Sequence, residues 1–471
     1  MIIQQYYTKS DLFIIFYNLA YFLNETERWD RPILAICSIF FLLGSVFFKK
    51  YRSIIFFLFL IFTSCQILVV FPKNSNHLNL MLFINLLLLL NFLKRYKFKI
   101  NNIEIIFEDF VALRWSLIIV YFLTGFHKLN SDFLLPYTSC ANWYHDKFIW
   151  FLTGNVFRPF PNFVYFLSPI LVVFLEIIES IGLLFKRTQL IALISFLFFH
   201  SYLSLGGFVD FAAVAVSIMV SFIPNKYINI INDLIQLKFL KFNFDRIQVT
   251  MLLFIILGFL YLVEYQYRIL PTDNPNLIRI IQGLLFNVLI IYILLPFIVL
   301  AFKNKIITWD IENNFTKNMR INLFSLLIFL FGFQNYLGLS TAGTFSMFSN
   351  IQTEGGKSNH LILYNNPFEI FPYQKYLVHI IKFEPPYYDF TKKFSRLKDK
   401  KIPKLVFSEF LIHLRNSGIE KFDADIYYKG KYHILKNAHL DKKWAPHQIP
   451  IERYFMNFRP VNNQNFSQCM W

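Results

Sequence analysis

Long apolar runs are the feature that most constrains what this chain can fold into. They recur from Leu12 to Leu339 with short polar breaks between them. A helix needs about 20 mainly apolar residues to cross the roughly 30 Å hydrocarbon core of a bilayer. Only 16% of the residues are charged, whereas a soluble domain carries about 25%. The sequence therefore predicts an all-α polytopic membrane domain.

The runs predict about nine or ten transmembrane helices. They are Pro32–Phe48, Ser53–Phe71, His77–Leu93, Val111–Phe126, Phe163–Phe185, Leu190–Leu205, Phe208–Ile223, Thr250–Val263, Ile280–Phe302 and Leu323–Leu339. The count depends on whether the short run Thr250–Val263 crosses fully. The N-terminal run Leu12–Leu23 would be only about 18 Å long as a helix. It either lies in the interface or recruits flanking residues to become a further span.

Loop charge predicts the orientation. Alternate connections hold the basic clusters Lys49/Lys50/Arg52, Lys94–Lys99, Lys186/Arg187, Lys226–Arg246 and Lys303–Arg320. Basic residues collect in cytoplasmic loops, so the formal charge of +17 needs no nucleic-acid partner. We expect a multi-pass protein of the plasma (inner) membrane whose segment after Leu339 is extracytoplasmic.

The composition becomes more polar from residue 340 to residue 471. Short β-type runs (His360–Tyr364 and Tyr376–Phe383) are followed by a helical stretch, Lys404–Asn416. A hairpin pattern around Lys429-Gly430 pairs Asp423–Tyr428 with Lys431–Leu435. These patterns predict two domains, a transmembrane domain at 1–339 and a small extracytoplasmic α+β domain at 340–471.

The four cysteines offer no CxxC pair, and no zinc signature is present, so we predict no metal site. Cys140 and Cys469 would both be extracytoplasmic, where oxidation to a disulfide is allowed. Whether the two thiols pair is left open by the sequence.

Ionisable residues from several helices share the predicted outer membrane level. Lys128 lies at the outer end of its helix, His77 opens the preceding helix at the outer face, and His200 is near the outer end of a third helix. Together they favour a shared polar cavity. His127 and Asp132 are near Lys128 in the sequence and Asp210 is near His200, so we group these three residues with the same cavity. The alternative for a terminal lysine is that it extends to the headgroups.

Three further charges lie deeper in the predicted spans. They are Arg114, Glu176 and Glu179. Intramembrane charges pair with one another or face a cavity, so these three are either structural ion pairs or members of a proton relay.

The stretch YFLTGFHKLNSDF, Tyr121–Phe133, resembles a known motif. It is similar to the YFxAGxxKLxxDW stretch of vitamin K-dependent γ-glutamyl carboxylases and their relatives with the horizontally transferred transmembrane (HTTM) domain. Val111–Arg114 precedes it at the family spacing, and Lys50–Arg52 followed by Asn76-His77 resembles the family's YR…NH order. Phe198–His200 and Thr344–His360 resemble two further shared segments. The similarity runs from about residue 10 to residue 365.

The resemblance implies a multi-pass enzyme with an extracytoplasmic active site. In the carboxylases the lysine that matches Lys128 deprotonates a reduced vitamin K-type quinone, and His77 matches a histidine beside that chemistry. Oxygen then converts the quinol to an epoxide, and a strong-base intermediate takes a proton from glutamate so that carbon dioxide adds. The loop Asn24–Arg31 is shorter than the first lumenal loop of the carboxylases, and no propeptide-binding region is visible. These departures count against glutamate carboxylation more than against quinol chemistry.

Two hypotheses from different classes follow. The first is a quinol-oxidising or quinol-epoxidising enzyme with Lys128, the base, and His77 as catalytic residues. His200, His127, Asp132 and Asp210 would line the quinone pocket. Its partners would be the bilayer, quinol, oxygen, carbon dioxide and a peptide or protein substrate at the outer face. The alternative is a non-enzymatic transporter or partner-binding anchor, in which Arg114, Glu176 and Glu179 line a continuous path.

Overall fold

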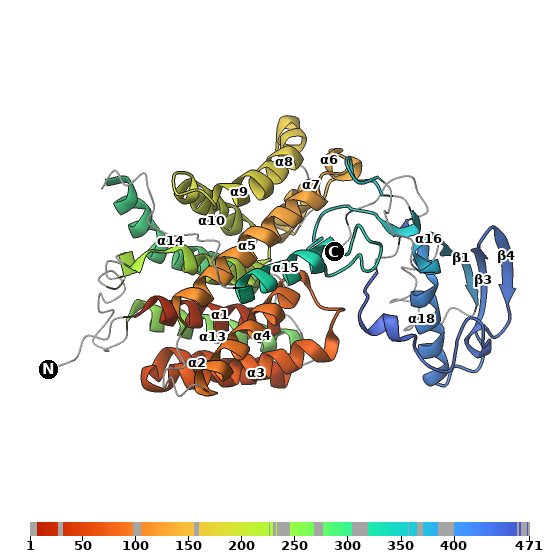
Figure 1. The fold of residues 1–471 in the computed structure, drawn as a ribbon, viewed down its shortest axis with the longest axis horizontal. Coiled ribbons are helices and arrows are strands. Elements are labelled where there is room, and N and C mark those ends of the chain that lie inside the picture. Colours follow the sequence, from red (N-terminus) through yellow and green to blue (C-terminus); the bar gives the residue numbers. More distant parts are fainter. Residues whose placement is uncertain are drawn as a thin grey trace.

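The computed structural model describes this chain except at residues 1–6, 27–31, 98–104, 155–159, 226, 229–231, 233–244, 268–276, 304–318, 357, 365–370, 385–399, 459–460, 463–468 and 470–471. Most described residues are helical, and a small antiparallel sheet lies at one end of a helical bundle (Figure 1). The basic clusters Lys226–Arg246 and Lys303–Arg320 lie largely outside the described residues.

The bundle contains the following helices: α1 (Lys9–Glu25), α2 (Pro32–Phe47), α3 (Arg52–Val70), α4 (Asn76–Lys97), α5 (Phe107–His127), α6 (Ser131–Leu134), α7 (Cys140–Thr153), α8 (Asn162–Phe174), α9 (Ser180–Gly182), α10 (Gln189–Leu205), α11 (Val209–Met219), α13 (Arg246–Tyr267), α14 (Leu277–Lys303) and α15 (Met319–Phe333). A π-helical turn, Leu175–Glu179, joins α8 to α9.

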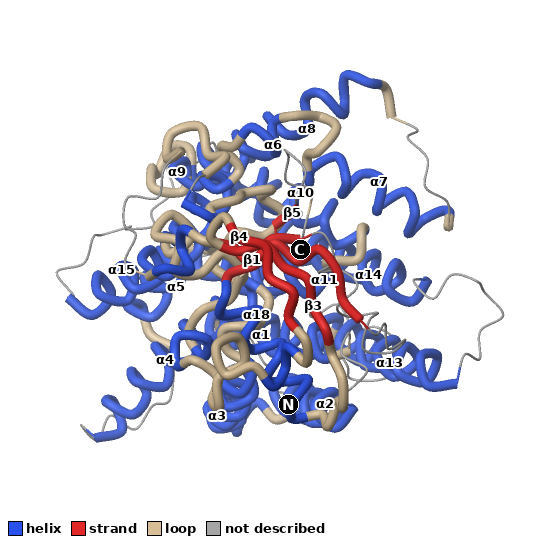
Figure 2. Tube along the Cα trace, turned by 90° about the vertical axis from the view of Figure 1, so that its right-hand side faces the viewer, coloured by secondary structure: helices blue, strands red, loops and turns tan. Residues whose placement is uncertain are grey.

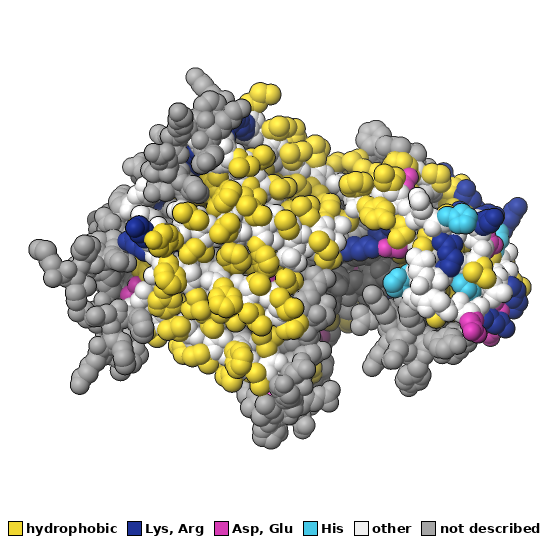
Figure 3. All heavy atoms as spheres, turned by 90° about the horizontal axis from the view of Figure 1, so that it is seen from below, with side chains coloured by type: hydrophobic (Ala, Val, Ile, Leu, Met, Phe, Trp, Pro, Cys, Tyr) yellow, Lys and Arg dark blue, Asp and Glu magenta, His cyan; other side chains and the backbone are white. Residues whose placement is uncertain are grey.

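Five of these helical segments are long and apolar enough to cross a membrane. They are Lys49–Val70, Asn76–Arg95, Phe107–His127, Asn162–Gly182 and Arg246–Glu264. Apolar side chains cover one broad face of the bundle (Figure 3), and only 22% of the Asn162–Gly182 window is buried inside the protein. Such an apolar yet exposed surface is typical of helices that face lipid. The helical membrane character is therefore present, while nine or ten full crossings remain a prediction.

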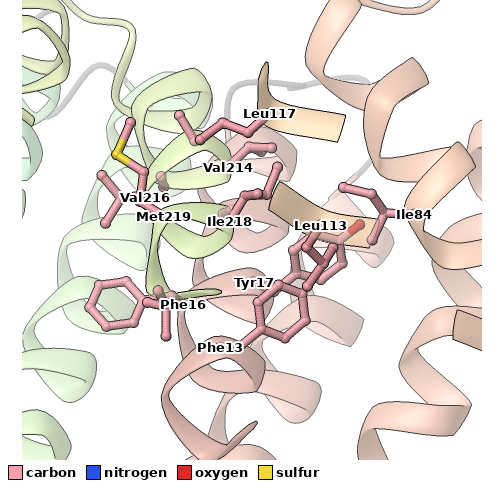
Figure 4. Close-up of a cluster of buried hydrophobic side chains, with 14 of the residues drawn as sticks. Phe13, Phe16, Tyr17, Ile84, Leu113, Leu117, Val214, Val216, Ile218 and Met219 are labelled. Atoms are coloured by element: carbon pink, nitrogen blue, oxygen red, sulfur yellow. The ribbon is translucent and has the colours of Figure 1, made fainter. Parts of the chain in front are cut away.

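Helix α1 is the central element of the bundle. Every residue from Leu12 to Glu25 is buried, and the helix packs against α2, α3 and α11. Figure 4 shows Phe13, Phe16 and Tyr17 of α1 in a buried cluster with apolar side chains of α4, α5 and α11. A helix that is apolar all round belongs in an interior, so the short N-terminal run is held inside the bundle.

The segment at residues 129–153, directly after α5, is mostly helical. It contains α6 and α7, because Asn130 and Ser139 cap the two helices through their side chains. Asn130 Oδ1 accepts a hydrogen bond from the Phe133 amide at 2.8 Å. Capping by such residues stabilises short helices. The composition of this segment does not by itself indicate them.

The C-terminal part is a five-stranded antiparallel sheet covered by one helix. Its strand order is β4-β3-β1-β2-β5, with β1 Leu377–Glu384, β2 Lys400–Pro403, β3 Asp423–Tyr428, β4 Lys431–Leu435 and β5 Val461–Asn462. Helix α18 (Lys404–Asn416) packs Phe407 and Leu411 against Val378, Ile380 and Ile426. Figure 2 shows the strands in front of the bundle.

The predicted hairpin is confirmed with its bounds. Lys429 and Gly430 both have positive φ, 50° and 77°, as the two-residue turns that match strand twist require. By contrast, His360–Tyr364 forms no strand, and only His360 makes an isolated bridge, to Asn130.

Backbone and covalent links join the sheet-bearing part to the bundle. Leu361 donates its amide to the Leu129 carbonyl at 2.9 Å, and Thr341 donates to Asn457 at 2.7 Å. A disulfide connects Cys140 at the start of α7 to Cys469. These links gather around the end of the bundle at which α5 stops and α4 begins, which we call the sheet end.

Candidate functional site

Lys128 forms a buried ion pair with Glu176. Its Nζ lies 2.6 Å from Glu176 Oε2 and 3.4 Å from the Thr124 carbonyl oxygen. Lys128 is 4% exposed and Glu176 is 5% exposed. Lys128 caps the C-terminus of α5, where the helix dipole favours a cation. The lysine therefore turns inward instead of extending to the headgroups.

The π-helical turn and a glycine bring Glu176 against α5. A Cβ atom added to Gly125 would lie 2.7 Å from Ile177 Cγ1 and 2.9 Å from Glu176 Cβ. Only glycine allows this approach, which explains why the YFLTGFHK string needs glycine three residues before the lysine. Single π-turns inside α-helices are common at functional sites.

His77 and Asp210 form a second buried pair at the sheet end. His77 Nε2 lies 3.2 Å from Asp210 Oδ2, 3.2 Å from Asn24 Oδ1 and 3.1 Å from Ser75 Oγ. His77 lies in the first turn of α4 and Asp210 in the first turn of α11. An anionic side chain is favoured at a helix N-terminus, so Asp210 is placed to hold the imidazole of His77.

His200 and Tyr121 form the third buried contact. The Tyr121 hydroxyl and His200 Nε2 share a hydrogen bond between α5 and α10. The Tyr121 hydroxyl also interacts electrostatically with Glu176. Tyr121 therefore lies between the Lys128–Glu176 pair and His200.

Phe211 joins the two histidines into one cluster. Its ring centroid is 6.1 Å from that of His77 and 5.2 Å from that of His200. Both imidazoles are buried, and within the described residues neither Nδ1 atom has a hydrogen-bond partner. An unpaired buried polar atom is costly, so two of them against one aromatic ring mark a place for a polar ligand. We call Lys128, Glu176, Tyr121, His200, His77, Asp210 and Phe211 the polar cluster.

His127 and Asp132 do not belong to the polar cluster. His127 Nδ1 lies 2.7 Å from the Tyr336 hydroxyl, and the Asn359 amide donates to Asp132 Oδ2 at 2.8 Å. The two contacts tie the end of α5 and the start of α6 to the segment that leads into the sheet-bearing part. The structure therefore gives these two residues a joining role.

Arg114 is separated from the other two deeper charges. Arg114 donates from Nε to the Ser221 carbonyl at 3.0 Å. It precedes Lys128 by 14 positions, about 21 Å along a helix axis. Glu179 is half-buried at the end of the π-turn. Of the three charges grouped by the sequence, only Glu176 reaches the polar cluster.

Lys147 is a neighbour of the polar cluster that the sequence did not single out. Its Nζ lies 4.1 Å from the ring centroid of Phe208 and 5.4 Å from that of Trp143. Burial lowers the pKa of this amine to about 8, and the charge of Asp210 acts in the opposite direction. The i, i+4 spacing of Trp143 and Lys147 on α7 was the available signal.

Tyr121, Gly125 and Phe211 were also missed as site residues. The first two lie inside the motif but were not assigned a role. For Phe211 no sequence signal was available, since it is one of 60 phenylalanines. In the part of the chain that the structure describes, no group of three metal-ligating side chains occurs.

No known family model, curated protein or solved structure matches this chain.

Proposed function

We propose that this chain is a membrane-embedded enzyme that uses the Lys128–Glu176 pair as the base toward a reduced quinone, as the resemblance to HTTM-domain carboxylases implies. The observation that carries the proposal is the pair of unpartnered imidazole nitrogens, His77 Nδ1 and His200 Nδ1, beside the ring of Phe211. A quinol offers an apolar ring and two hydroxyl groups, and it dissolves in the bilayer. An apolar wall with a few convergent polar groups is the usual form of a small-molecule site.

The polar cluster is suited to remove a proton from a hydroxyl group. Breaking the O–H bond of the quinol would place the proton on the Lys128–Glu176 pair and leave the negative charge on the quinol oxygen. The ammonium of Lys128 would then stabilise that oxyanion in a site of low dielectric constant. Oxygen would convert the quinol to its epoxide and water, and coupling to carbon dioxide addition at a glutamyl substrate is the further step implied by the resemblance.

His77 and His200 would orient the ring. Asp210 holds Nε2 of His77, and Tyr121 holds Nε2 of His200, which leaves both Nδ1 atoms for the substrate. A histidine fixed through one nitrogen has a defined tautomer at the other. The matched arrangement of the two imidazoles therefore supports binding of a ligand with two oxygen atoms.

The same proposal places the site on the extracytoplasmic side of the plasma membrane. The Cys140–Cys469 disulfide supports this, because disulfides persist in oxidising compartments. The basic loops that the positive-inside rule assigns to the cytoplasm support it independently.

The test is oxidation and epoxidation of a reduced naphthoquinone by the purified chain in detergent. We expect Lys128→Ala to lower the rate at least 100-fold, as removal of a general base does. Lys382→Ala is the matched control, because that exposed lysine lies on β1, in the sheet-bearing part. A Lys128→Ala rate equal to wild type in a folded protein would reject the proposal. Failure of the wild-type chain to bind any quinone would favour the transporter or anchor.

A further inference from the structure

Three lysines converge on two touching aromatic rings in the sheet-bearing part. Lys404 Nζ and Lys443 Nζ lie 5.2 Å and 5.7 Å from the ring centroid of Trp444. Lys429 Nζ lies 5.6 Å from the centroid of Tyr428, whose ring is 5.4 Å from that of Trp444. We call Lys404, Lys429, Lys443, Tyr428 and Trp444 the lysine triad site.

The three lysines come from different elements. Lys404 opens α18, Lys429 lies in the turn between β3 and β4, and Lys443 follows β4 in a loop. Trp444 is 2% exposed and forms the fixed floor. The fold, rather than local sequence, brings these ammonium groups together. Figure 3 shows how Lys and Arg side chains gather on this part of the molecule, beside the apolar bundle.

The positive charges are poorly compensated. Burial lowers the pKa of Lys404, and the charges of Lys443 and Lys429 add to this effect, while Asp441 acts in the opposite direction. Within the described residues none of the three lysines forms an ion pair, whereas nearby Lys436 pairs with Asp423 at 3.1 Å. Like charges placed together cost free energy, and an anion bound between them would remove that cost.

The start of α18 adds hydrogen-bond donors. Its N-cap residue is Pro403, and no side chain accepts from the first-turn amides. The first amides of a helix need acceptors, and phosphate is a common one. Lysine binds phosphate as a point charge.

We propose that the lysine triad site binds a phosphate group, carried by a soluble compound or by a lipid headgroup. This site is separate from the polar cluster and does not depend on the proposed function. Bound phosphate would hold α18, the β3–β4 turn and the Lys443 loop together.

The test uses the full chain in phosphatidylcholine nanodiscs and inorganic pyrophosphate as the probe in titration calorimetry. We expect saturable one-site binding that Lys404→Gln with Lys443→Gln weakens at least tenfold. Lys382→Gln, another exposed lysine of the same sheet, should leave binding unchanged. The proposal would be overturned if the double variant bound pyrophosphate as tightly as wild type. It would also be overturned if wild type bound neither pyrophosphate nor the phosphatidylglycerol vesicles described below.

Two further arms define the ligand. Co-flotation with phosphatidylglycerol vesicles that is lost in the double variant would indicate a lipid headgroup, whereas pyrophosphate binding without flotation would indicate a soluble phosphate. Citrate binding as tight as pyrophosphate binding would overturn the assignment to phosphate. Thermal unfolding of the double variant without ligand verifies that it is folded.

Discussion

Glu176 Oε2 lies 2.6 Å from Lys128 Nζ, and the two residues come from helices that meet only because residue 125 is glycine. The pair joins α5 to the π-helical turn after α8 in a buried environment. Removing one partner of a buried pair leaves an uncompensated charge. Stability and the proposed chemistry at this site therefore depend on the same contact.

We expect Lys128→Met and Glu176→Gln each to lower the free energy of unfolding by about 3–5 kcal/mol, the usual cost of breaking a buried pair. The double variant should lose less than the sum of the two, because it leaves no buried charge. Unfolding in mixed detergent, followed by the helical signal, measures all four proteins. Lys186→Met at an exposed position is the control, and single-variant losses equal to that control would contradict the prediction.

Gly125→Ala should separate α5 from the π-turn. The added Cβ would lie 3.0 Å from the Ile177 amide nitrogen as well as against two side-chain atoms. Overpacking of this kind costs about 1–3 kcal/mol. Gly182→Ala is the matched helical control, since its nearest neighbour is the Ala192 Cβ at 3.3 Å. The same detergent unfolding measures both, and a smaller loss at Gly125 than at Gly182 would exclude this view of the helix contact.

The sequence predicted the elements better than their contacts. Apolar runs and turn residues located the helices and the β3–β4 hairpin, because those signals are local. The partnership of Lys128 with Glu176 was not predicted, because it depends on how α8 is packed and on a π-turn. The position of the Phe211 ring between His77 and His200 was not predicted either, since nothing in the local sequence distinguishes Phe211 from other apolar residues.

Motif and loop charge nevertheless located part of the candidate site. His77, His200, Lys128 and Asp210 were grouped by helix-end position, and the structure places them in one polar cluster. His127 and Asp132 were grouped by the same criterion but face the segment that joins bundle and sheet. Proximity along a helix end gives the level of a side chain but not the direction in which it points.

The disulfide should appear in thiol counting. Cys140 and Cys469 are paired, whereas Cys37 and Cys65 are free. Mass spectrometry of the denatured chain should therefore find two alkylated cysteines before reduction and four after it. Because the closed loop spans a sequence separation of 329, Cys469→Ser should cost about 6 kcal/mol in the chain-entropy model. Cys65→Ser should cost almost nothing, and four reactive thiols without reductant would disprove the bridge.

Glu409 on α18 forms one ion pair with the bundle and one within the sheet-bearing part. Its carboxylate pairs with Lys73, in the turn before α4, and lies 2.6 Å from Arg453 Nε. Arg453 is buried, so Glu409→Gln should destabilise the sheet-bearing part by about 2–4 kcal/mol by leaving the charge of Arg453 unpaired. Lys73→Gln should cost less than about 1 kcal/mol, because that side chain is 45% exposed.

Hydrogen exchange of the α18 amides in the full chain compares the effect of Glu409→Gln with that of Lys73→Gln. The Glu409 variant should exchange faster than wild type, and the Lys73 variant should match wild type closely. Equal protection in both variants would show that Arg453 does not depend on Glu409.

Lys147 should show an unusual pH dependence. Burial lowers its pKa to about 8, whereas an unperturbed lysine has a pKa of about 10.4. Labelling by an amine-specific reagent, followed by peptide mass spectrometry, should therefore be half-maximal near pH 8 at Lys147. At Lys382 the hydrogen bond to Glu384 raises the pKa, so this exposed lysine should need a more alkaline solution.

The same shift sets the sign of a stability effect. Between about pH 8 and pH 10.4 the unfolded chain binds more protons at Lys147 than the folded chain, so stability rises with pH there. The unfolding free energy of wild type relative to Lys147→Gln should therefore increase from pH 7 to pH 10.5. A difference that is flat or falls over this interval, together with labelling that is half-maximal above pH 10, would show that Lys147 is solvated rather than enclosed by Trp143 and Phe208.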